Sequence, residues 1–114
     1  MGECIFCMIA KHEIPSQVVY EDEEIVAFKD LNPGAPVHIL IIPKRHIPGL
    51  MALSEEDTAL VGRIVLAANH LAEESAIAKS GFRIVTNCGE DAGQSVPHLH
   101  FHLLGGRPMG WPPG

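Results

Sequence analysis

The order of apolar and polar positions along the chain predicts a set of short strands. Runs of β-branched, leucine and aromatic residues bounded by turn-forming clusters are typical of strands. Such runs lie at residues 18–20, 25–29, 37–42, 82–87 and 98–104. The first two flank an acidic turn at residues 21–24, which is typical of a solvent-exposed hairpin tip.

Two further segments have the pattern of helices. Residues 4–11 predict a short helix, which Pro15 ends. Ser54 followed by Asp57 resembles a capping box, and a long helix is predicted from there to about residue 78 because apolar residues recur at helical spacing, at Leu60, Ile64, Ala68 and Leu71. Four or five strands around one long helix predict an α+β fold with mainly antiparallel pairing.

Length and composition narrow the class of protein. A chain of 114 residues predicts one domain, over residues 1–114. The net charge of −6 argues against a nucleic-acid partner, though not against one small phosphate-bearing ligand. No apolar run is long enough to span a membrane, and residues 1–4 lack the basic start of a signal peptide. The 3 cysteines are too few for a disulfide framework, so we expect a reduced, cytoplasmic protein.

Three histidines alternate with apolar residues near the end of the chain. On a strand, His98, His100 and His102 would share one face, while the core would receive Leu99, Phe101 and Leu103. Such a row of imidazoles suits a metal site. It also suits nucleophilic and acid–base chemistry on a phosphate. The alternative is that the three histidines form only a polar surface and take part in no reaction.

The segment before these histidines favours phosphate. Residues 87–95 contain small residues, backbone N–H groups and the hydroxyl of Ser95, three residues before the first imidazole. Backbone N–H groups in such loops bind anions. A glycine-rich turn alone is weak evidence, but beside three histidines it predicts a phosphate cradle.

The same residues carry a resemblance to a known family. Residues 98–104 (HLHFHLL) resemble the signature of the histidine-triad (HIT) family. The C-terminal WPPG at residues 111–114 resembles the Hint branch of this family. The Hint branch is also similar at residues 14–15, 28–30, 35–38 and 93–96. The Cys-x-x-Cys at residues 4–7 is similar to that of bacterial-type members. This likeness covers nearly the whole chain, and it implies a HIT-like α+β fold: a mainly antiparallel five-stranded sheet with one long and one short helix, in a homodimer that extends the sheet.

The resemblance implies a mechanism that needs no cofactor. His100 would attack the α-phosphorus of a purine nucleoside 5′-phosphoramidate, and water would then hydrolyse the nucleotidyl-histidine. His102 would bind phosphate oxygens, and His38 would orient the nucleophile and fix its tautomer. Ser95 and Gln94 would contact the phosphate or the leaving group. Without the resemblance, the favoured interpretation of His38 is a buried core histidine.

It also implies a site for a purine nucleoside monophosphate. Asp30 would accept the ribose hydroxyls, Asn87 and Gly93 would support the phosphate, and an apolar slot for the base would be formed by Phe6, Ile9, Ile14, Phe28 and Leu31. Taken alone, Asp30 is a turn residue and the apolar residues are core. Trp111 would reach the partner's active site or pack against its own subunit.

The cysteines predict a structural zinc site. Cys4 and Cys7 have the spacing of two thiolates on one tetrahedral ion. The resemblance to cysteine-bearing relatives implies His46 and His98 as the remaining ligands. His12 is nearer in sequence, and two free thiols on a short helix are the alternative.

Two other functions remain open on the sequence. One is a dinucleoside polyphosphate hydrolase or nucleotidyltransferase with a similar triad. The other is a zinc-bearing interaction module for which nucleotide binding is regulatory. Release of amine from an adenosine phosphoramidate, compared with cleavage of a diadenosine polyphosphate, separates the three.

Overall fold

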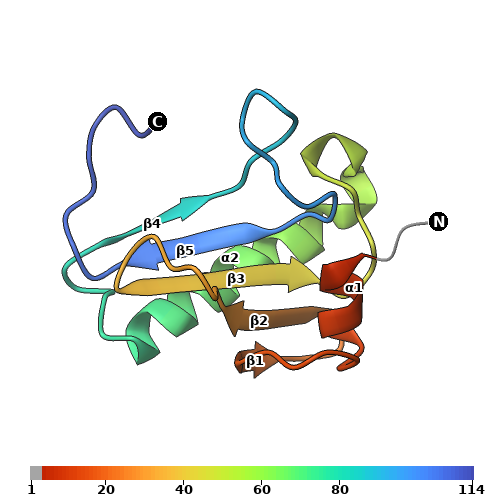
Figure 1. The fold of residues 1–114 in the computed structure, drawn as a ribbon, viewed down its shortest axis with the longest axis horizontal. Helices are drawn as coiled ribbons and strands as arrows, with labels where there is room; N and C mark the ends of the chain where they lie inside the picture. The colour runs from red at the N-terminus through yellow and green to blue at the C-terminus, as the bar shows by residue number, and fades with distance from the viewer. Residues whose placement is uncertain (1–3) are drawn as a thin grey trace.

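One antiparallel sheet of five strands organises the fold, as predicted. In a computed structural model that describes residues 4–114, the sheet has the order β1-β2-β3-β5-β4 (Figure 1). Residues 1–3, on which the expectation about a leader rests, lie outside the described residues. The strands are β1 (Val18–Glu21), β2 (Ile25–Lys29), β3 (Val37–Pro43), β4 (Phe82–Val85) and β5 (Phe101–Gly105). The helices are α1 (Ile5–Ala10) and α2 (Thr58–Glu74), with short 3-10 turns at Leu50–Ala52 and Glu55–Asp57.

Each face of the sheet is covered by one helix. In Figure 1, α2 lies behind the sheet and α1 lies in front of β2 and β3. The larger core joins α2 to the far face and includes the predicted trio Leu99, Phe101 and Leu103. A smaller cluster on the near face is formed by Phe6, Ile9, Ala10, Val26, Phe28, Leu40 and Ile42. No helix among residues 4–114 is both long and apolar enough to cross a bilayer.

The predicted start of the long helix is confirmed, but its predicted end is not. The backbone N–H of Ser54 donates to the Asp57 carboxylate at 2.9 Å, which satisfies a free donor at the helix start. The helix ends at Glu74 rather than near residue 78, because Ala76 adopts a left-handed backbone with φ of 60°. This turn lets the N–H of Ile77 donate to the Ala72 carbonyl and buries the Ile77 side chain in the core.

The last strand is also shorter than predicted. The β3–β5 ladder runs from the Val37–Gly105 pair to the Ile41–Phe101 pair, so His98 and His100 precede the strand. Continuing it would place Leu99 opposite Pro43, which has no N–H to contribute. Instead, the N–H of Leu99 donates to the Ile47 carbonyl at 2.6 Å. The expectation of three histidines on one strand face is therefore wrong for His98.

β4 is also shorter than predicted: it ends at Val85, which pairs with His102, rather than at residue 87. Beyond that point the side chain of Thr86 replaces the ladder, with its hydroxyl donating to the His100 carbonyl at 2.8 Å. This bond holds the backbone of His100 in place, although His100 is not part of a strand.

We predict that Gly105→Ala destabilises the protein. An added Cβ would lie 2.5 Å from the Ile77 Cδ1 atom and 3.2 Å from its Cβ, and Ile77 is only 3% exposed. Overpacking of this kind should lower the free energy of unfolding by about 1–3 kcal/mol in urea denaturation. Gly110→Ala is the control, because its Cβ would meet nothing within 4 Å. Equal stability of the two variants would contradict the packing argument.

Candidate active site and metal cluster

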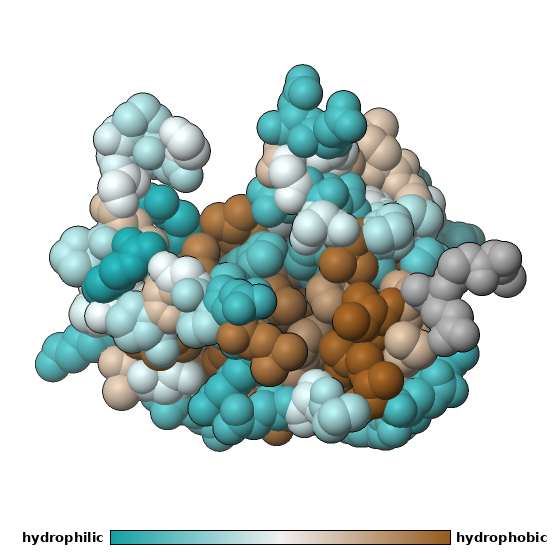
Figure 2. Space-filling model, in the orientation of Figure 1, coloured by the Kyte–Doolittle hydropathy of each residue, from teal (hydrophilic) through white to brown (hydrophobic). Residues whose placement is uncertain are grey.

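A cavity of about 260 Å³ opens on the near face of the sheet, beside α1. Figure 2 shows apolar side chains gathered in the middle of this face. The apolar part of the wall is supplied by Ile5, Phe6, Ile9, Ile14, Pro15, Phe28, Leu31 and Leu40, and the polar part by Ser16, Lys29, Asp30, Asn32, Ser95, His100 and His102. A cavity with an apolar wall and a few converging polar groups is typical of a ligand site.

Most of the predicted nucleotide-binding residues lie in this wall. All five residues predicted for the base slot are there, although Leu31 is 90% exposed at the rim. Asn87, Gly93 and Gln94 are not part of the wall. The Gln94 amide is engaged elsewhere: its nitrogen donates to the carbonyls of Pro48 (2.8 Å) and Val96 (3.1 Å).

A chain of hydrogen bonds sets the tautomer of His102. The backbone N–H of Gly34 donates to Nδ1 of His38 at 2.9 Å, so the proton of the neutral His38 ring is on Nε2. That Nε2–H donates to Nδ1 of His102 at 2.9 Å. The proton of His102 is therefore on Nε2. Within residues 4–114 this Nε2 is the one buried side-chain nitrogen or oxygen without a partner.

His100 has the opposite tautomer. Its Nδ1 lies 2.7 Å from the backbone carbonyl of His98, which can only accept, so the ring donates from Nδ1 and leaves a lone pair on Nε2. The ring is held by an edge-on contact with Phe6, with centroids 5.0 Å apart. We expected His38 to orient the nucleophile. The structure instead places His38 on His102, and the His98 carbonyl orients His100.

Burial favours the neutral form of His102 and of His38. It is the main reason that the pKa of His102 falls from 6.5 to about 4, and the neighbouring His100 and His38 lower it further. Burial also lowers the pKa of His38, against an opposing effect of Asp30. Neutral imidazole is the form that can act as a nucleophile or donate a single N–H.

Asp30 is a turn residue that also lines the cavity. One carboxylate oxygen accepts the backbone N–H of Asn32 at 2.8 Å, as a turn residue does. The other lies 3.4 Å from Nε2 of His38. Asp30 also lines the cavity, so its carboxylate remains available to a ligand.

A second cluster lies at the start of α1. Ligand atoms of Cys4, Cys7, His46 and His98 all lie within 4.8 Å of one another. Nδ1 of His98 is 3.3 Å from the Cys4 sulfur and 3.5 Å from the Cys7 sulfur, and Nδ1 of His46 is 3.2 Å from the Cys7 sulfur. Tetrahedral zinc with two sulfur and two nitrogen ligands separates such atoms by roughly 3.3–3.8 Å. The donor set therefore fits a closed structural zinc site.

His98 is oriented for this role. Its Nε2–H donates to the Pro43 carbonyl at 2.8 Å, which leaves the Nδ1 lone pair directed at the thiols. An outer hydrogen bond of this kind is the usual support of a metal-binding histidine. His12, the alternative ligand, contacts Glu21 at 2.9 Å and is not part of the cluster.

Comparison with known proteins shows the family of the chain. The model of the HIT domain matches residues 11–109. The chain belongs to the HIT family. It is 46% identical over 108 residues to the purine nucleoside phosphoramidase of Escherichia coli K12, covering 95% of this chain and 91% of that protein. It is 51% identical to an uncharacterised HIT-like protein of Synechocystis, covering 98% of this chain and 97% of the relative.

The HIT fold is also shared with solved structures. The HIT family hydrolase of Legionella pneumophila superposes with a TM-score of 0.96 at 47% identity, covering 98% of this chain and 100% of that one. A HIT family hydrolase of Clostridium thermocellum has a TM-score of 0.93 at 52% identity, covering 96% of each chain.

Several residues of this HIT domain site were not predicted. Leu40 could have been found, because it alternates with His38 along β3 and pairs with His102. Ile5, Pro15, Lys29 and Asn32 directly neighbour predicted residues in the sequence, and Ser16 follows Pro15. The Gly34 N–H and the His98 carbonyl carry no sequence signal, because any residue supplies these groups.

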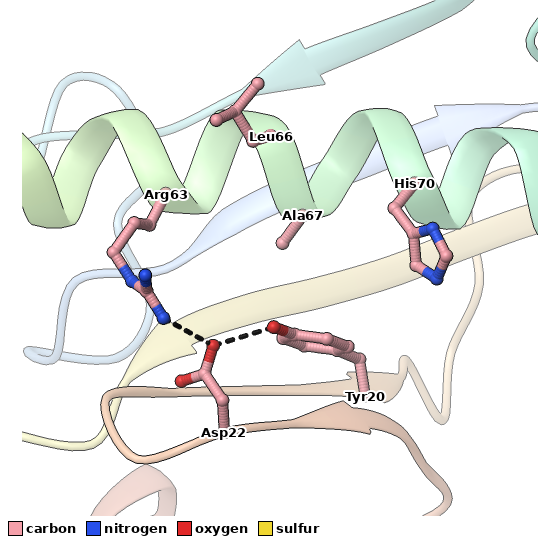
Figure 3. A pocket seen from close by; sticks show the side chains of 6 residues that line it. All are labelled: Tyr20, Asp22, Arg63, Leu66, Ala67 and His70. Atoms are coloured by element: carbon pink, nitrogen blue, oxygen red, sulfur yellow. Dashed lines mark hydrogen bonds and ion pairs between the residues drawn. The ribbon is translucent and has the colours of Figure 1, made fainter.

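A different hollow of about 360 Å³ lies between β1 and α2, and its wall contains none of His98, His100 and His102 (Figure 3). Asp22 lines this hollow and accepts hydrogen bonds from the Tyr20 hydroxyl (2.7 Å) and from Arg63 (3.0 Å). Because these polar groups pair with one another, the hollow is better explained as a structural link between the hairpin and the helix.

We predict that acid destabilises the protein in part through His102. The folded-state pKa of about 4 lies below the ordinary 6.5, so the unfolded chain binds the extra proton first. The free energy of unfolding should therefore fall as the pH drops from about 6.5 towards 4. Urea denaturation at several pH values should show a shallower fall for His102→Gln.

His70→Gln is the matched control, since its side chain is 58% exposed on α2. An acid-induced fall of the same slope in wild type and His102→Gln would show that His102 is not the group responsible.

Proposed function

We propose that this protein hydrolyses the P–N bond of purine nucleoside 5′-phosphoramidates through a nucleotidyl-histidine intermediate on His100. The observation that carries the proposal is the pair of opposite tautomers in one cavity. His100 has a lone pair on Nε2, and His102 has a buried N–H without an acceptor. A phosphoryl group supplies what both rings lack: an electrophilic phosphorus and an acceptor oxygen.

The chemistry proceeds in two displacements. Nε2 of His100 attacks the α-phosphorus while the Nε2–H of His102 donates to a phosphoryl oxygen. The P–N bond breaks, and the amine leaves with a proton taken from solvent. Water then attacks the phosphorus, the P–N bond to His100 breaks, and the nucleoside monophosphate and a proton are released. Dividing the reaction avoids a direct attack by water on the amidate.

The rest of the cavity suits a nucleotide. The apolar wall between α1 and β2 accommodates a flat base, and Asp30 can accept two ribose hydroxyls. The phosphoramidase activity named for the E. coli relative supports the same substrate class.

We further propose a homodimer that extends the sheet. β4 is an edge strand whose main chain can pair with a second copy. On the neighbouring helix α2, Leu66 is 67% exposed and Val65 is 38% exposed, which would favour burial against a partner. Trp111, 83% exposed in the tail, is available to reach the partner subunit in such a dimer.

The third proposal is one structural zinc ion held by Cys4, Cys7, His46 and His98. The ion would link α1 to the loops on which the two histidines lie. Cys4 and Cys7 are free thiols in the structure, in keeping with a reducing compartment such as the cytoplasm. Burial, together with the neighbouring Cys4 thiol, raises the pKa of Cys7, so zinc binding should release protons and weaken as the pH falls.

We predict that His100→Ala folds normally and loses hydrolysis of adenosine 5′-phosphoramidate by roughly 10³-fold or more. His70→Ala, far from the cavity on α2, is the matched control. If the wild-type protein is denatured during turnover without acid, mass spectrometry should show one nucleotidyl group attached to His100. His100→Gly should still bind AMP, because the base slot and Asp30 are unchanged.

Near-wild-type amine release by His100→Ala would refute the covalent mechanism. Faster cleavage of a diadenosine polyphosphate than of the phosphoramidate would change the substrate class and leave the mechanism intact.

We predict one zinc ion per chain in protein purified without a metal-affinity tag or chelator. Elemental analysis is the measurement, and Cys4→Ser should release the ion and lower the melting temperature more than it lowers activity. Cys88→Ser is the control, because Cys88 lies outside the cluster. Less than about 0.2 zinc per chain in the wild type would rule out the site.

A further inference from the structure

The thiols of Cys4 and Cys7 lie side by side at the start of α1. Their sulfur atoms are no more than 4.8 Å apart. Cys4 is the N-cap residue of α1, and its sulfur accepts the backbone N–H of Cys7 at 3.3 Å. Because both side chains lie on one turn, their rotation can join the two sulfurs in a disulfide without displacement of the sheet.

Both cysteines can be reached from the surface. A hollow of about 320 Å³ is lined by Cys4, Cys7, Met8, Lys11 and Glu13. Cys4 also lines a second hollow, of about 510 Å³, which lies against residues 95–97. A small oxidant such as hydrogen peroxide can therefore approach the pair.

We propose that Cys4 and Cys7 are a modification site: a peroxide oxidises them to a reversible disulfide, and the disulfide loosens α1 from the nucleotide cavity. The effect on nucleotide binding rests on the proposed function, whereas formation of the disulfide does not. Two thiols that are reduced in the resting cell and join under oxidation are typical of a redox-sensing site.

His98 supplies a base for this reaction. Its Nε2–H donates to the Pro43 carbonyl at 2.8 Å, so Nδ1 carries a lone pair. This Nδ1 lies 3.3 Å from the Cys4 sulfur and 3.5 Å from the Cys7 sulfur, so it can accept a thiol proton. The thiolate is the form that reacts with a peroxide.

The oxidation takes two steps. The first thiolate attacks one oxygen of hydrogen peroxide, an S–O bond forms, the O–O bond breaks, and the departing hydroxide takes up a proton as water. The second thiolate attacks the resulting sulfenic sulfur, the S–S bond forms, the S–O bond breaks, and a second water leaves. The two thiols lose two electrons and two protons in total, and one peroxide is reduced to two water molecules.

The disulfide breaks the links between α1 and two histidines. In the reduced protein the Cys7 sulfur lies 3.2 Å from Nδ1 of His46, in addition to the contacts of both sulfurs with His98. A disulfide has no S–H to donate to these rings. It also has no thiolate to offer to the proposed zinc ion. Oxidation therefore ends the hydrogen bonds and the proposed metal link together.

Phe6 connects this change to the nucleotide cavity. Its side chain is 7% exposed, and its ring lies edge-on to His100 with centroids 5.0 Å apart. Ile5 and Ile9 of the same helix also line the cavity. Because a helix of 6 residues has little stability by itself, a freed α1 must be ordered again whenever a nucleotide binds. The disulfide form should therefore bind nucleotide more weakly, while the His98 carbonyl still orients His100.

The test compares tag-free protein before and after treatment with hydrogen peroxide. Mass spectrometry without reductant should show the loss of two hydrogen atoms from the peptide that carries Cys4 and Cys7, and dithiothreitol should restore them. Cys88→Ser is the control and should respond as the wild type does. Cys7→Ser should gain oxygen at Cys4 instead.

Two further measurements report on α1 without requiring hydrolysis. Hydrogen exchange of the amides at residues 5–10 should be faster in the disulfide form. AMP should bind to this form about fivefold more weakly than to the reduced protein. Dithiothreitol should reverse both changes, which separates them from methionine oxidation because this reagent does not reduce methionine sulfoxide.

The remaining outcomes separate this proposal from the others. A treated chain that only gains oxygen at the two cysteines, or that forms a disulfide with Cys88, would overturn it. A Cys4–Cys7 disulfide that changes neither the exchange of α1 nor the affinity for AMP would also overturn it. Reduced protein that binds no AMP would refute the proposed function, and the mass and exchange measurements would still decide the disulfide proposal. Untreated protein without zinc would refute only the metal site.

Discussion

The organisation of the site depends on Pro43, the last residue of β3. Because Pro43 has no N–H, the antiparallel ladder with β5 stops at the Ile41–Phe101 pair, and the chain before Phe101 leaves the sheet. The Pro43 carbonyl then accepts the Nε2–H of His98 at 2.8 Å. One residue thus ends the strand and orients the first histidine of the motif away from the other two.

This division gives three similar side chains three different roles. His98 directs Nδ1 to the thiols and its carbonyl to His100, whereas His100 and His102 line the nucleotide cavity. The buried N–H of His102 lacks a partner, at a cost of about 1–3 kcal/mol to the free protein. Such a group is expected where a ligand completes the hydrogen bond, so the cost is consistent with a site arranged for an anionic oxygen.

Helix α1 connects the two clusters. Cys4 and Cys7 flank Phe6, whose ring lies edge-on to Phe28, to His98 and to His100, with centroids 5.5, 5.9 and 5.0 Å apart. A helix of 6 residues has little stability by itself. A metal ion at its first turn would hold Phe6 in the wall of the base slot, which explains why a structural ion should affect stability more than chemistry. The same helix provides Ile5 to the wall of the cavity.

The sequence by itself determined the α+β class, all five strands, both helices and the residue types of both clusters, because hydrophobic period and side-chain chemistry are local properties. It also correctly placed Leu99, Phe101 and Leu103 in the core. Only the tertiary structure decided that His38 contacts His102 rather than His100, that Gln94 braces two loops, and that His46 rather than His12 joins the cysteines. These contacts join residues as far as 64 positions apart, and the contact of Gln94 uses a backbone carbonyl, a group that every residue carries. The ring atom that remains free for chemistry depends on the strand register and the path of the loops, which a pattern of side chains does not encode locally.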